Sequence, residues 1–321
     1  MWLSLANVNK YSGYGLLWTS QRLVRLSWKN NFPARQGSTP KNPIRRSSSQ
    51  QSEEIADQSV SSAYDNSLSL ISTVEDVERF KQTKKINTTK FRQHVNPLSR
   101  KFQTPCDLPA SWPQKAYWDC QKQLYLDIGC GKGGFLLQLA QASIDGSTHL
   151  NNLNYLGLEI RPSVVEFAAT RVPQRKLQGL VSFVGCNVNV DLERLLSLYQ
   201  TENGSAQFLH TVSIQFPDPH FKERHKKRKV VNQELICTLA KYMSPKSMVF
   251  LQSDIQDVLD DMRGSFREDK GTTYFEDEIE NFEEYLNTNP IGIPTEREVS
   301  VLEKDFPVYR TVFRRNDTPF S

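Results

Sequence analysis

A carboxylate and a group of glycines lie together in the segment Leu126–Gly134, which reads LDIGCGKGG. Asp127 comes just before Gly129 and Gly131, and an apolar run leads into the segment. Glycines allow the backbone to turn sharply and to lie against a ligand. Open α/β sheets bind nucleotide-like cofactors at such a turn between a strand and a helix. The segment therefore predicts a cofactor site that includes Asp127, Gly129 and Gly131.

The glycines alone leave two cofactors open, because Gly129, Gly131 and Gly134 also satisfy the GxGxxG pattern of NAD(P) enzymes. Asp127 favours S-adenosylmethionine, since a carboxylate there repels a pyrophosphate but attracts a cationic amino-acid group. Glu159 ends a later apolar run, where it can accept hydrogen bonds from the ribose hydroxyls of either cofactor. Each acid alone also fits a solvated strand end, but the pair in this context favours S-adenosylmethionine.

Three more residues are assigned to the cofactor site by their positions after apolar runs. Asn187 follows the run that ends at Val184, where its amide can bond an adenine edge or simply form a turn. Val188 comes next and is assigned to the same site. Arg161 is either a partner of Glu159 or a surface charge.

A second acidic position is Asp218, which lies between Pro217 and Pro219. The two prolines break a strand and fix the turn, so they present the carboxylate rigidly at the edge of a sheet. The run Lys222–Lys229 follows directly and holds only one acid, Glu223. A charged run is usually a solvated face, but beside a candidate active site it predicts contacts to the phosphates of a polyanion.

The elements that position these residues form a regular pattern from Leu124 onward. Five apolar runs alternate with helical stretches, and this predicts a parallel sheet covered on both faces. We expect the strands at Leu124–Ile128, Tyr155–Ile160, Leu180–Val184, Thr211–Phe216 and Met248–Gln252, and a helix over Phe135–Ala140. The last runs, Val299–Leu302 and Val308–Phe313, predict an antiparallel edge. The expected fold is an α/β, Rossmann-like, doubly wound and mostly parallel sheet with an antiparallel C-terminal edge strand.

Charge divides the chain of 321 residues into unlike parts. Residues 1–52 hold eight Lys or Arg and no Asp or Glu; the rest holds 32 basic and 36 acidic residues, so the formal charge of +4 becomes −4. This opening predicts an organellar transit peptide, with a basic tail that contacts RNA as the alternative. Residues 53–80 predict a disordered linker, 81–123 an N-terminal arm and 124–321 the catalytic domain.

Two classes of protein are disfavoured by composition. The five cysteines are scattered singly without metal-ligand spacing, so we expect no metal site and a reducing compartment. No apolar stretch approaches the 18 or so residues of a membrane span, so we expect no membrane partner.

The run FPDPHFKERHKKR resembles the signature of the tRNA (guanine-N7)-methyltransferases. LDIGCGKGG and YLGLEIRP match that family's cofactor motifs, and the QSD of Gln252–Asp254 and the segment Pro294–Arg315 are similar to its C-terminal motifs. The stretch Phe91–Phe102 is similar to its N-terminal arm, closest to bacterial and plastid-type members. The resemblance covers roughly residues 90–315.

The resemblance implies a class I fold that transfers a methyl group from S-adenosylmethionine to N7 of guanosine 46 in the variable loop of tRNA. It places cofactor ligands on Asp127, Glu159, Asn187 and Asp218, with Asp218 also the catalytic residue. It places substrate contacts on Lys222, Asp254, Thr295 and Glu298. Asp127 and Asn187 depart from bacterial relatives, which often have Glu and Asp there, and the C-terminal motif leaves Glu298 or position 297 as the contact.

Guanine N7 carries a lone pair and no proton, so the expected role of Asp218 is to orient the reactants and not to remove a proton. Two other functions remain open: an NAD(P) oxidoreductase, and a catalytically silent RNA-binding or scaffold subunit on the same fold. A need for an accessory protein subunit is not excluded by the sequence. The expected location is an organelle, with the plastid favoured over the mitochondrion.

Overall fold

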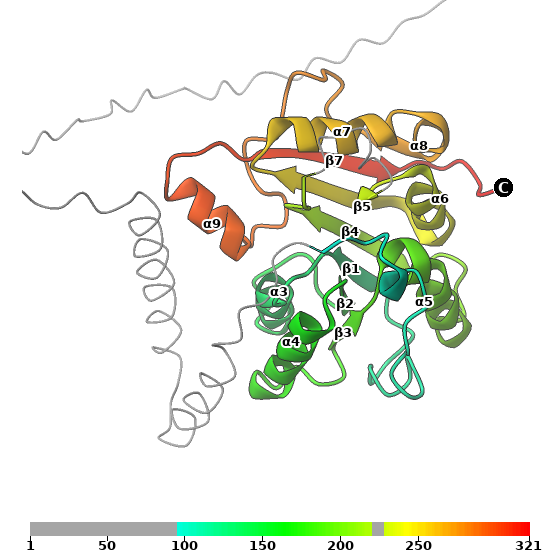
Figure 1. Cartoon of the computed structure of the whole chain (residues 1–321). Coiled ribbons are helices and arrows are strands. Elements are labelled where there is room, and N and C mark those ends of the chain that lie inside the picture. The colour runs from blue at the N-terminus through cyan, green and yellow to red at the C-terminus, as the bar shows by residue number, and fades with distance from the viewer. Residues whose placement is uncertain (1–94, 220–227) are drawn as a thin grey trace, which may run out of the picture. The chain divides into compact units, whose positions relative to one another are not determined.

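The structure is a computed structural model that describes residues 95–219 and 228–321 (Figure 1). The chain divides into the units Met1–Thr83 and Lys84–Ser321, and every described residue belongs to the second. The predicted transit peptide (1–52), the linker (53–80), residues 81–94 of the arm, and Lys222 lie outside the described residues.

Seven strands form one sheet in the order β3-β2-β1-β4-β5-β7-β6. Their bounds are β1 Leu124–Ile128, β2 Asn154–Glu159, β3 Val181–Gly185, β4 Leu209–Gln215, β5 Met243–Ser253, β6 Phe275–Asp277 and β7 Tyr309–Arg315. The neighbours among β1 to β5 pair in parallel, whereas β7 is antiparallel to both β5 and β6. The expected Rossmann-like fold is confirmed, with the three-residue β6 added outside the antiparallel strand β7.

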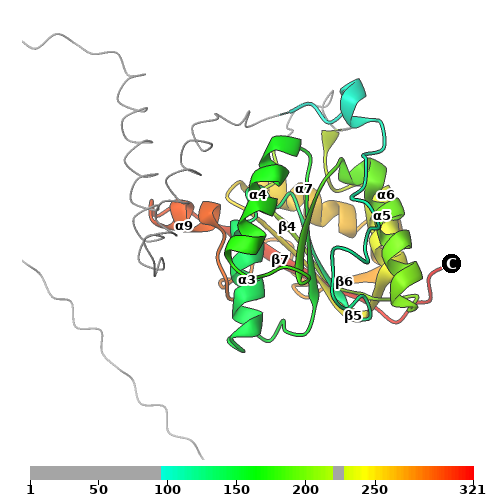
Figure 2. The same ribbon diagram turned by 90° about the horizontal axis from the view of Figure 1, so that it is seen from below.

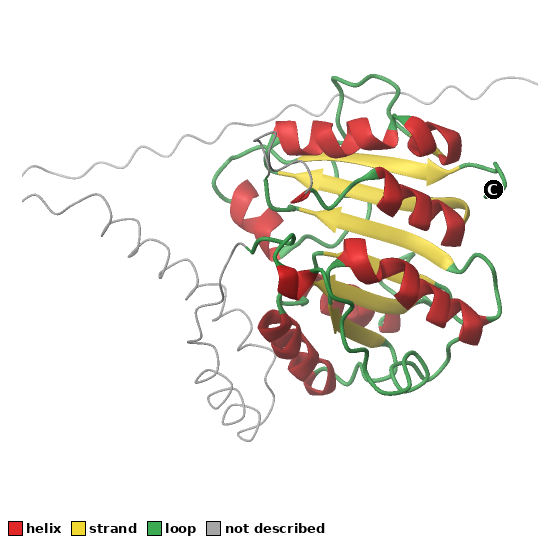
Figure 3. Cartoon of the chain, turned by 45° about the vertical axis from the view of Figure 1, so that its right-hand side comes forward, coloured by secondary structure: helices red, strands yellow, loops and turns green. Residues whose placement is uncertain are grey.

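Helices cover both faces of this sheet (Figure 3). Their bounds are α3 Gly134–Ile144, α4 Pro162–Gln174, α5 Val188–Asn203, α6 Gln233–Tyr242, α7 Gln256–Phe266, α8 Asp269–Tyr274 and α9 Glu296–Leu302, with a short 3₁₀ helix η1 at Arg100–Phe102. Figure 2 shows α3 and α4 on one side of the strands and α5 and α6 on the other. Two separate hydrophobic clusters fill the spaces beneath the two helical layers. All residues of β1 and β2 are buried, as expected for strands covered on both faces.

The expected strand at Val299–Leu302 is wrong, because these residues form the end of helix α9. Thr295 caps the helix: its Oγ1 accepts a hydrogen bond from the Glu298 backbone N–H at 3.0 Å. The Glu298 carboxylate accepts one from the Thr295 backbone N–H at 3.4 Å. These two bonds make a capping box, which satisfies free N–H groups of the first turn and favours a helix over a strand.

Candidate functional site

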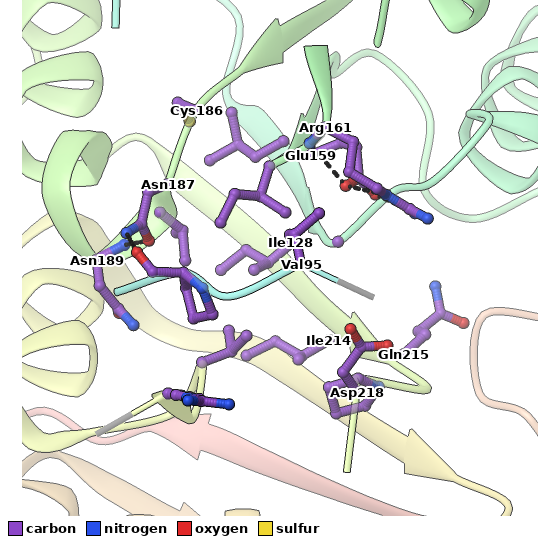
Figure 4. A pocket seen from close by; sticks show the side chains of 18 of the residues that line it. Val95, Ile128, Glu159, Arg161, Cys186, Asn187, Asn189, Ile214, Gln215 and Asp218 are labelled. Atoms are coloured by element: carbon purple, nitrogen blue, oxygen red, sulfur yellow. Dashed lines mark hydrogen bonds and ion pairs between the residues drawn. The ribbon is translucent and has the colours of Figure 1, made fainter. Parts of the chain in front are cut away.

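A pocket opens at the carboxyl ends of β1, β2, β3 and β4 (Figure 4). Its apolar lining includes Ile128, Leu158, Ile160, Val188 and Ile214. Its polar lining includes Glu159, Arg161, Asn187 and Asp218, which the sequence analysis singled out. The sheet order reverses between β1 and β4. Ligands of open α/β sheets bind at such a point.

Glu159 is held in place by Arg161 (Figure 4). Arg161 Nε lies 2.9 Å from Glu159 Oε1, and Arg161 Nη2 lies 3.0 Å from Oε2. The backbone N–H of Arg161 donates to Oε1 at 3.0 Å. Hydrogen bonding to Glu159 also raises the pKa of the Arg161 guanidinium. The structure therefore supports the interpretation of Arg161 as a partner of Glu159 over that of a surface charge.

Asp127 lies beneath the pocket and not on its lining, and its side chain is buried. Its Oδ1 accepts hydrogen bonds from Ser213 Oγ at 2.7 Å and from Gln215 Nε2 at 3.4 Å. Burial raises the pKa of this carboxyl to about 6, although the bond from Ser213 opposes the shift. A carboxylate in such a place is stabilised by any cation that comes near it.

Gly129 lines the pocket, whereas Gly131 does not. Their φ angles are +80° and +54°, in the left-handed region that side chains rarely adopt. The glycine loop therefore turns as expected from the sequence.

Asn187 fastens the N-terminal arm to the edge of the pocket. Its Nδ2 donates to the carbonyl of Phe102 at 3.0 Å and to that of Pro97 at 3.4 Å. Its Oδ1 accepts from the Asn189 backbone N–H at 3.2 Å and so caps α5. Both ends of the amide are thus engaged by protein, and the predicted adenine contact stays a prediction. Val188, the first residue of α5, lines the pocket as expected.

Asp218 and Glu159 reach the pocket from the two strands that flank β1 (Figure 4). Phe216, just before the two prolines, has a φ of +50°. Its backbone N–H donates to the Gln252 carbonyl at 2.9 Å, which fixes the turn. Arg228, near the end of the basic run, also lines the pocket.

The C-terminal candidates lie outside the pocket lining. Asp254 forms an ion pair with Arg297, whose side chain is 59% exposed. Glu298 is buried, and its Oε1 accepts from Arg310 Nη2 at 2.8 Å. Between the two open positions, 297 therefore faces solvent and 298 faces the interior.

Sequence reasoning missed Gln215, which lines the pocket and bonds Asp127, and the arm residues Val95 and Pro97, which also line it. A glutamine at the end of an apolar strand was a signal available in the sequence, since buried amides need partners. The arm residues gave no such signal. In the described part of the chain, no group of three or more His, Cys, Asp or Glu residues is arranged to hold a metal ion. None of the described helices has the length and apolar character to cross a membrane.

Comparisons with known proteins agree with this geometry. Residues 121–311 match a family model described as "Putative methyltransferase". A protein of Synechococcus elongatus named tRNA (guanine-N(7)-)-methyltransferase is 42% identical over 230 residues, which are 70% of this chain and 95% of the relative. One of the same name from Microcystis aeruginosa is 43% identical over 224 residues, 70% of this chain and 96% of the relative. The chain therefore belongs to the tRNA (guanine-N(7)-)-methyltransferase family.

Proposed function

We propose that this enzyme transfers the methyl group of S-adenosylmethionine to N7 of guanosine 46 in the variable loop of tRNA. Family membership supports tRNA as the substrate and guanine N7 as the methylated atom. S-adenosylmethionine as the donor and guanosine 46 as the methylated position go beyond what family membership supports. The observation that best supports S-adenosylmethionine as the donor is the burial of Asp127 next to a pocket that Glu159 lines.

The residues present fit this cofactor. Glu159, oriented by Arg161, offers carboxylate oxygens to ribose hydroxyls. Val188, Ile160 and Ile214 supply apolar walls suited to a flat adenine ring. Asp127 favours a cationic amino-acid group, because among the described residues its buried charge is stabilised by hydrogen bonds from the neutral side chains of Ser213 and Gln215.

The bound cofactor would supply an electrophilic methyl group on a sulfonium. Guanine N7 brings its own lone pair, so the chain needs no general base and contributes mainly by holding the reactants in line. Asp218, fixed between two prolines, orients the guanine edge or the cofactor's amino group. Arg228 at the rim of the pocket, with the basic run before it, attracts the phosphates of the tRNA. The guanine must leave its stack in the folded tRNA to enter the pocket.

We further propose that the enzyme works in the plastid. Two observations support this location: the acid-free stretch of residues 1–52, and relatives from the cyanobacteria Synechococcus and Microcystis.

The test uses the full-length protein, an unmodified tRNA transcript and S-adenosylmethionine with a labelled methyl group. We expect label in the transcript, cleavage chemistry specific for N7-methylguanosine at guanosine 46, and no label when that base is adenosine. Calorimetry with NADH beside S-adenosylmethionine serves as the control. Heat from the nicotinamide cofactor alone would overturn the donor, label at another guanosine would overturn the position, and tRNA binding without any label would indicate a silent RNA-binding subunit.

A further inference from the structure

Two buried glutamines lie side by side at the edge of the pocket, which Gln215 lines and Gln252 does not. Gln215 and Gln252 are paired residues at the ends of the neighbouring parallel strands β4 and β5. Gln252 Nε2 donates to Gln215 Oε1 at 2.7 Å. Gln252 is fully buried and Gln215 is 8% exposed. A buried amide costs free energy unless each of its polar atoms finds a partner, so the other bonds of this pair are informative.

On one side the pair reaches the cofactor end of the site, where Gln215 Nε2 donates to Asp127 Oδ1 at 3.4 Å. On the other side Gln252 Nε2 donates to Glu298 Oε2 at 3.1 Å. Arg310 closes this end, since its Nε donates to Gln252 Oε1 at 3.2 Å and its Nη2 to Glu298 Oε1 at 2.8 Å. Buried hydrogen bonds thus run without a break from Asp127 to Glu298. We call Gln215 and Gln252 the glutamine bridge.

The residues at the two ends of this hydrogen-bond network determine which way the oxygen and nitrogen of both amides point. The guanidinium of Arg310 can only donate, so it must face the oxygen of Gln252. The amide nitrogen of Gln252 then faces Gln215, whose own nitrogen is directed at the Asp127 carboxylate. If either amide were reversed, an amide N–H would face another N–H donor, or an amide oxygen would face a carboxylate, and both contacts are unfavourable in a buried place. The bridge therefore has one arrangement, and a shift at one end is felt at the other.

Helix α9 has a second contact with the cofactor side. Glu296, its first residue, lies so close to Gly134 of the glycine loop that a Cβ at Gly134 would come within 2.2 Å of Glu296 Oε1. Glu298, two residues later, carries the end of the bridge. The first turn of α9, which begins after Thr295, thus lies close to the glycine loop and is linked to Asp127 by buried hydrogen bonds.

We propose that Gln215 and Gln252 are positioning residues for methyl transfer, which couple the buried carboxylate Asp127 to the first turn of α9, where the predicted substrate contacts Thr295 and Glu298 lie. This inference rests on the proposed function, because it needs a cofactor at Asp127 and RNA at the α9 end. A cofactor bound at Asp127 restricts the motion of the glutamine bridge and thereby positions the first turn of α9 for RNA, and bound RNA does the same for Asp127. Each ligand therefore binds more tightly when the other is present. An apolar pair of similar volume would pack the interior about as well without this coupling.

The test compares Gln252→Met with Gln233→Met in the full-length protein. Methionine keeps the length of glutamine and removes its hydrogen bonds. Gln233 is the control, since its half-buried amide also donates a hydrogen bond, to the Ser265 carbonyl at 2.8 Å, but takes no part in the bridge. The dissociation constant of S-adenosylmethionine is measured with and without saturating tRNA whose guanosine 46 is replaced by adenosine, so that no methyl group is transferred; kcat and KM are measured with unmodified tRNA.

We expect wild type and Gln233→Met to bind S-adenosylmethionine at least about 5-fold more tightly with tRNA present, the lower end of common coupling factors. In Gln252→Met this ratio should approach 1, while binding of S-adenosylmethionine alone changes little and kcat falls about 10-fold. Gln215→Met should bring the ratio toward 1 as well and is the second variant if Gln252→Met does not fold; because Gln215 lines the pocket, this variant should also weaken binding of S-adenosylmethionine alone. The double variant should be no worse than either single one, because the two residues act as a unit.

A pH profile separates positioning from packing. The groups that act on Asp127 are Ser213 and Gln215, which lower its pKa, and Glu159, which raises it; Tyr125 and Cys130 lie close to it as well. Loss of the Gln215 bond should move the acidic limb of S-adenosylmethionine binding to higher pH, with no such move in Gln233→Met. A wild-type coupling ratio of 1, an unchanged ratio in Gln252→Met, or multiplicative losses in the double variant would overturn the inference. Failure of wild type to bind S-adenosylmethionine or to label tRNA would instead overturn the proposed function.

Discussion

Asp127 lowers the stability of the ligand-free protein near neutral pH. Burial raises its pKa from 3.8 to about 6, so between these values the folded chain holds more protons than the unfolded chain. Stability therefore falls as the pH rises through this window, and above pH 6 the carboxylate costs about 3 kcal/mol. A bound cation would offset this cost, which is how the same burial favours a cationic cofactor.

We accordingly expect Asp127→Asn to be more stable than wild type near pH 7.5 without ligand, by up to about 3 kcal/mol. The gain should shrink as the pH falls below 6 and vanish near pH ~3, where the wild-type carboxyl is protonated in both states. Binding of S-adenosylmethionine should weaken at least about 10-fold, since one charge-assisted contact is lost. Denaturant unfolding at the two pH values and calorimetry measure both effects. Asp257→Asn, an exposed position in α7, is the control, and an equal gain at both pH values would contradict this account of Asp127.

For Asp218 we predict a loss in rate. Asp218→Ala should lower the rate of methyl transfer by about 100-fold or more, the scale for one well-placed polar group at a reacting centre. tRNA binding should change much less, because phosphate contacts elsewhere carry it. Asp218→Asn keeps the shape and one acceptor, and its pH–rate profile should keep the wild-type form, since no proton is abstracted. Single-turnover rates with labelled cofactor test this, and wild-type activity in Asp218→Ala would mean that the turn is only structural.

The individual site residues were predictable from the sequence to different degrees. Glu159 and Asp218 reach the pocket because Glu159 ends strand β2 and Asp218 lies shortly after β4, and strand ends can be predicted from apolar runs. The partners of Asn187 and Glu298 come from Phe102 and Arg310, segments that only the folded chain brings close. Burial of a polar group depends on such distant partners, so no local pattern could have indicated it.

At the scale of elements, the parallel strands were predicted well and the C-terminal helix was not. The strand β1 at Leu124–Ile128 has the predicted bounds, because a short run with four apolar residues out of five, closed by a glycine, fits a buried strand. The run Val299–Leu302 is as apolar but equally short, and length alone does not separate a strand from a helical turn. The deciding signal was Thr295 with Glu298 three residues later, the sequence of a capping box.

Strand β2 supports the glycine loop through a glycine of its own. Gly157 pairs with Asp127 on β1 and with Phe183 on β3. A Cβ at Gly157 would lie 2.5 Å from the Phe183 ring and 2.8 Å from Cys130 Sγ. The same ring lies against Gly133, so a shift of Phe183 would disturb the loop at two points.

We therefore expect Gly157→Ala to destabilise the protein by about 1–3 kcal/mol, the usual cost of overpacking a core. It should also weaken S-adenosylmethionine binding, because the displaced ring pushes on the glycine loop. Gly264→Ala is the matched control: it lies in α7 with nothing within 4 Å of its added Cβ, and alanine favours a helix. Denaturant unfolding and calorimetry give the two quantities, and equal stability of the two variants would refute the packing argument.

At the scale of the whole molecule, the net charge does not favour a polyanion, and positive charge is concentrated in one short run. Residues 53–321 carry 32 basic and 36 acidic side chains, so we predict that attraction to tRNA comes from the run Lys222–Lys229, of which Arg228 lines the pocket. Neutralising Lys226, Lys227 and Arg228 together should raise the Kd for tRNA and lower the slope of log Kd against log salt by about 2.

The matched control for this prediction neutralises Lys115, Lys241 and Lys270, which do not line the pocket. It changes the net charge by the same amount, so it separates a local footprint from the overall charge. Filter binding over a range of salt concentrations measures both slopes. Equal slopes in the two triple variants would mean that the basic run is only a solvated face.

The N-terminal region lies outside the family model, which matches residues 121–311, and the relatives match about 70% of the chain. Its first 52 residues hold eight basic side chains and no acid, the composition of an organellar import signal. We expect residues 1–80 fused to a fluorescent protein to enter plastids, and a chain that begins near Phe80 to retain methyl transfer.

A fusion in which the eight Lys and Arg residues become Gln is the control, and it should stay in the cytosol because import signals of this kind need their positive charge. Diffuse fluorescence of the unaltered fusion would contradict the import signal, and entry into mitochondria alone would correct its destination. If instead the shortened chain binds tRNA more weakly and loses activity, the basic opening acts on RNA and belongs to the working enzyme.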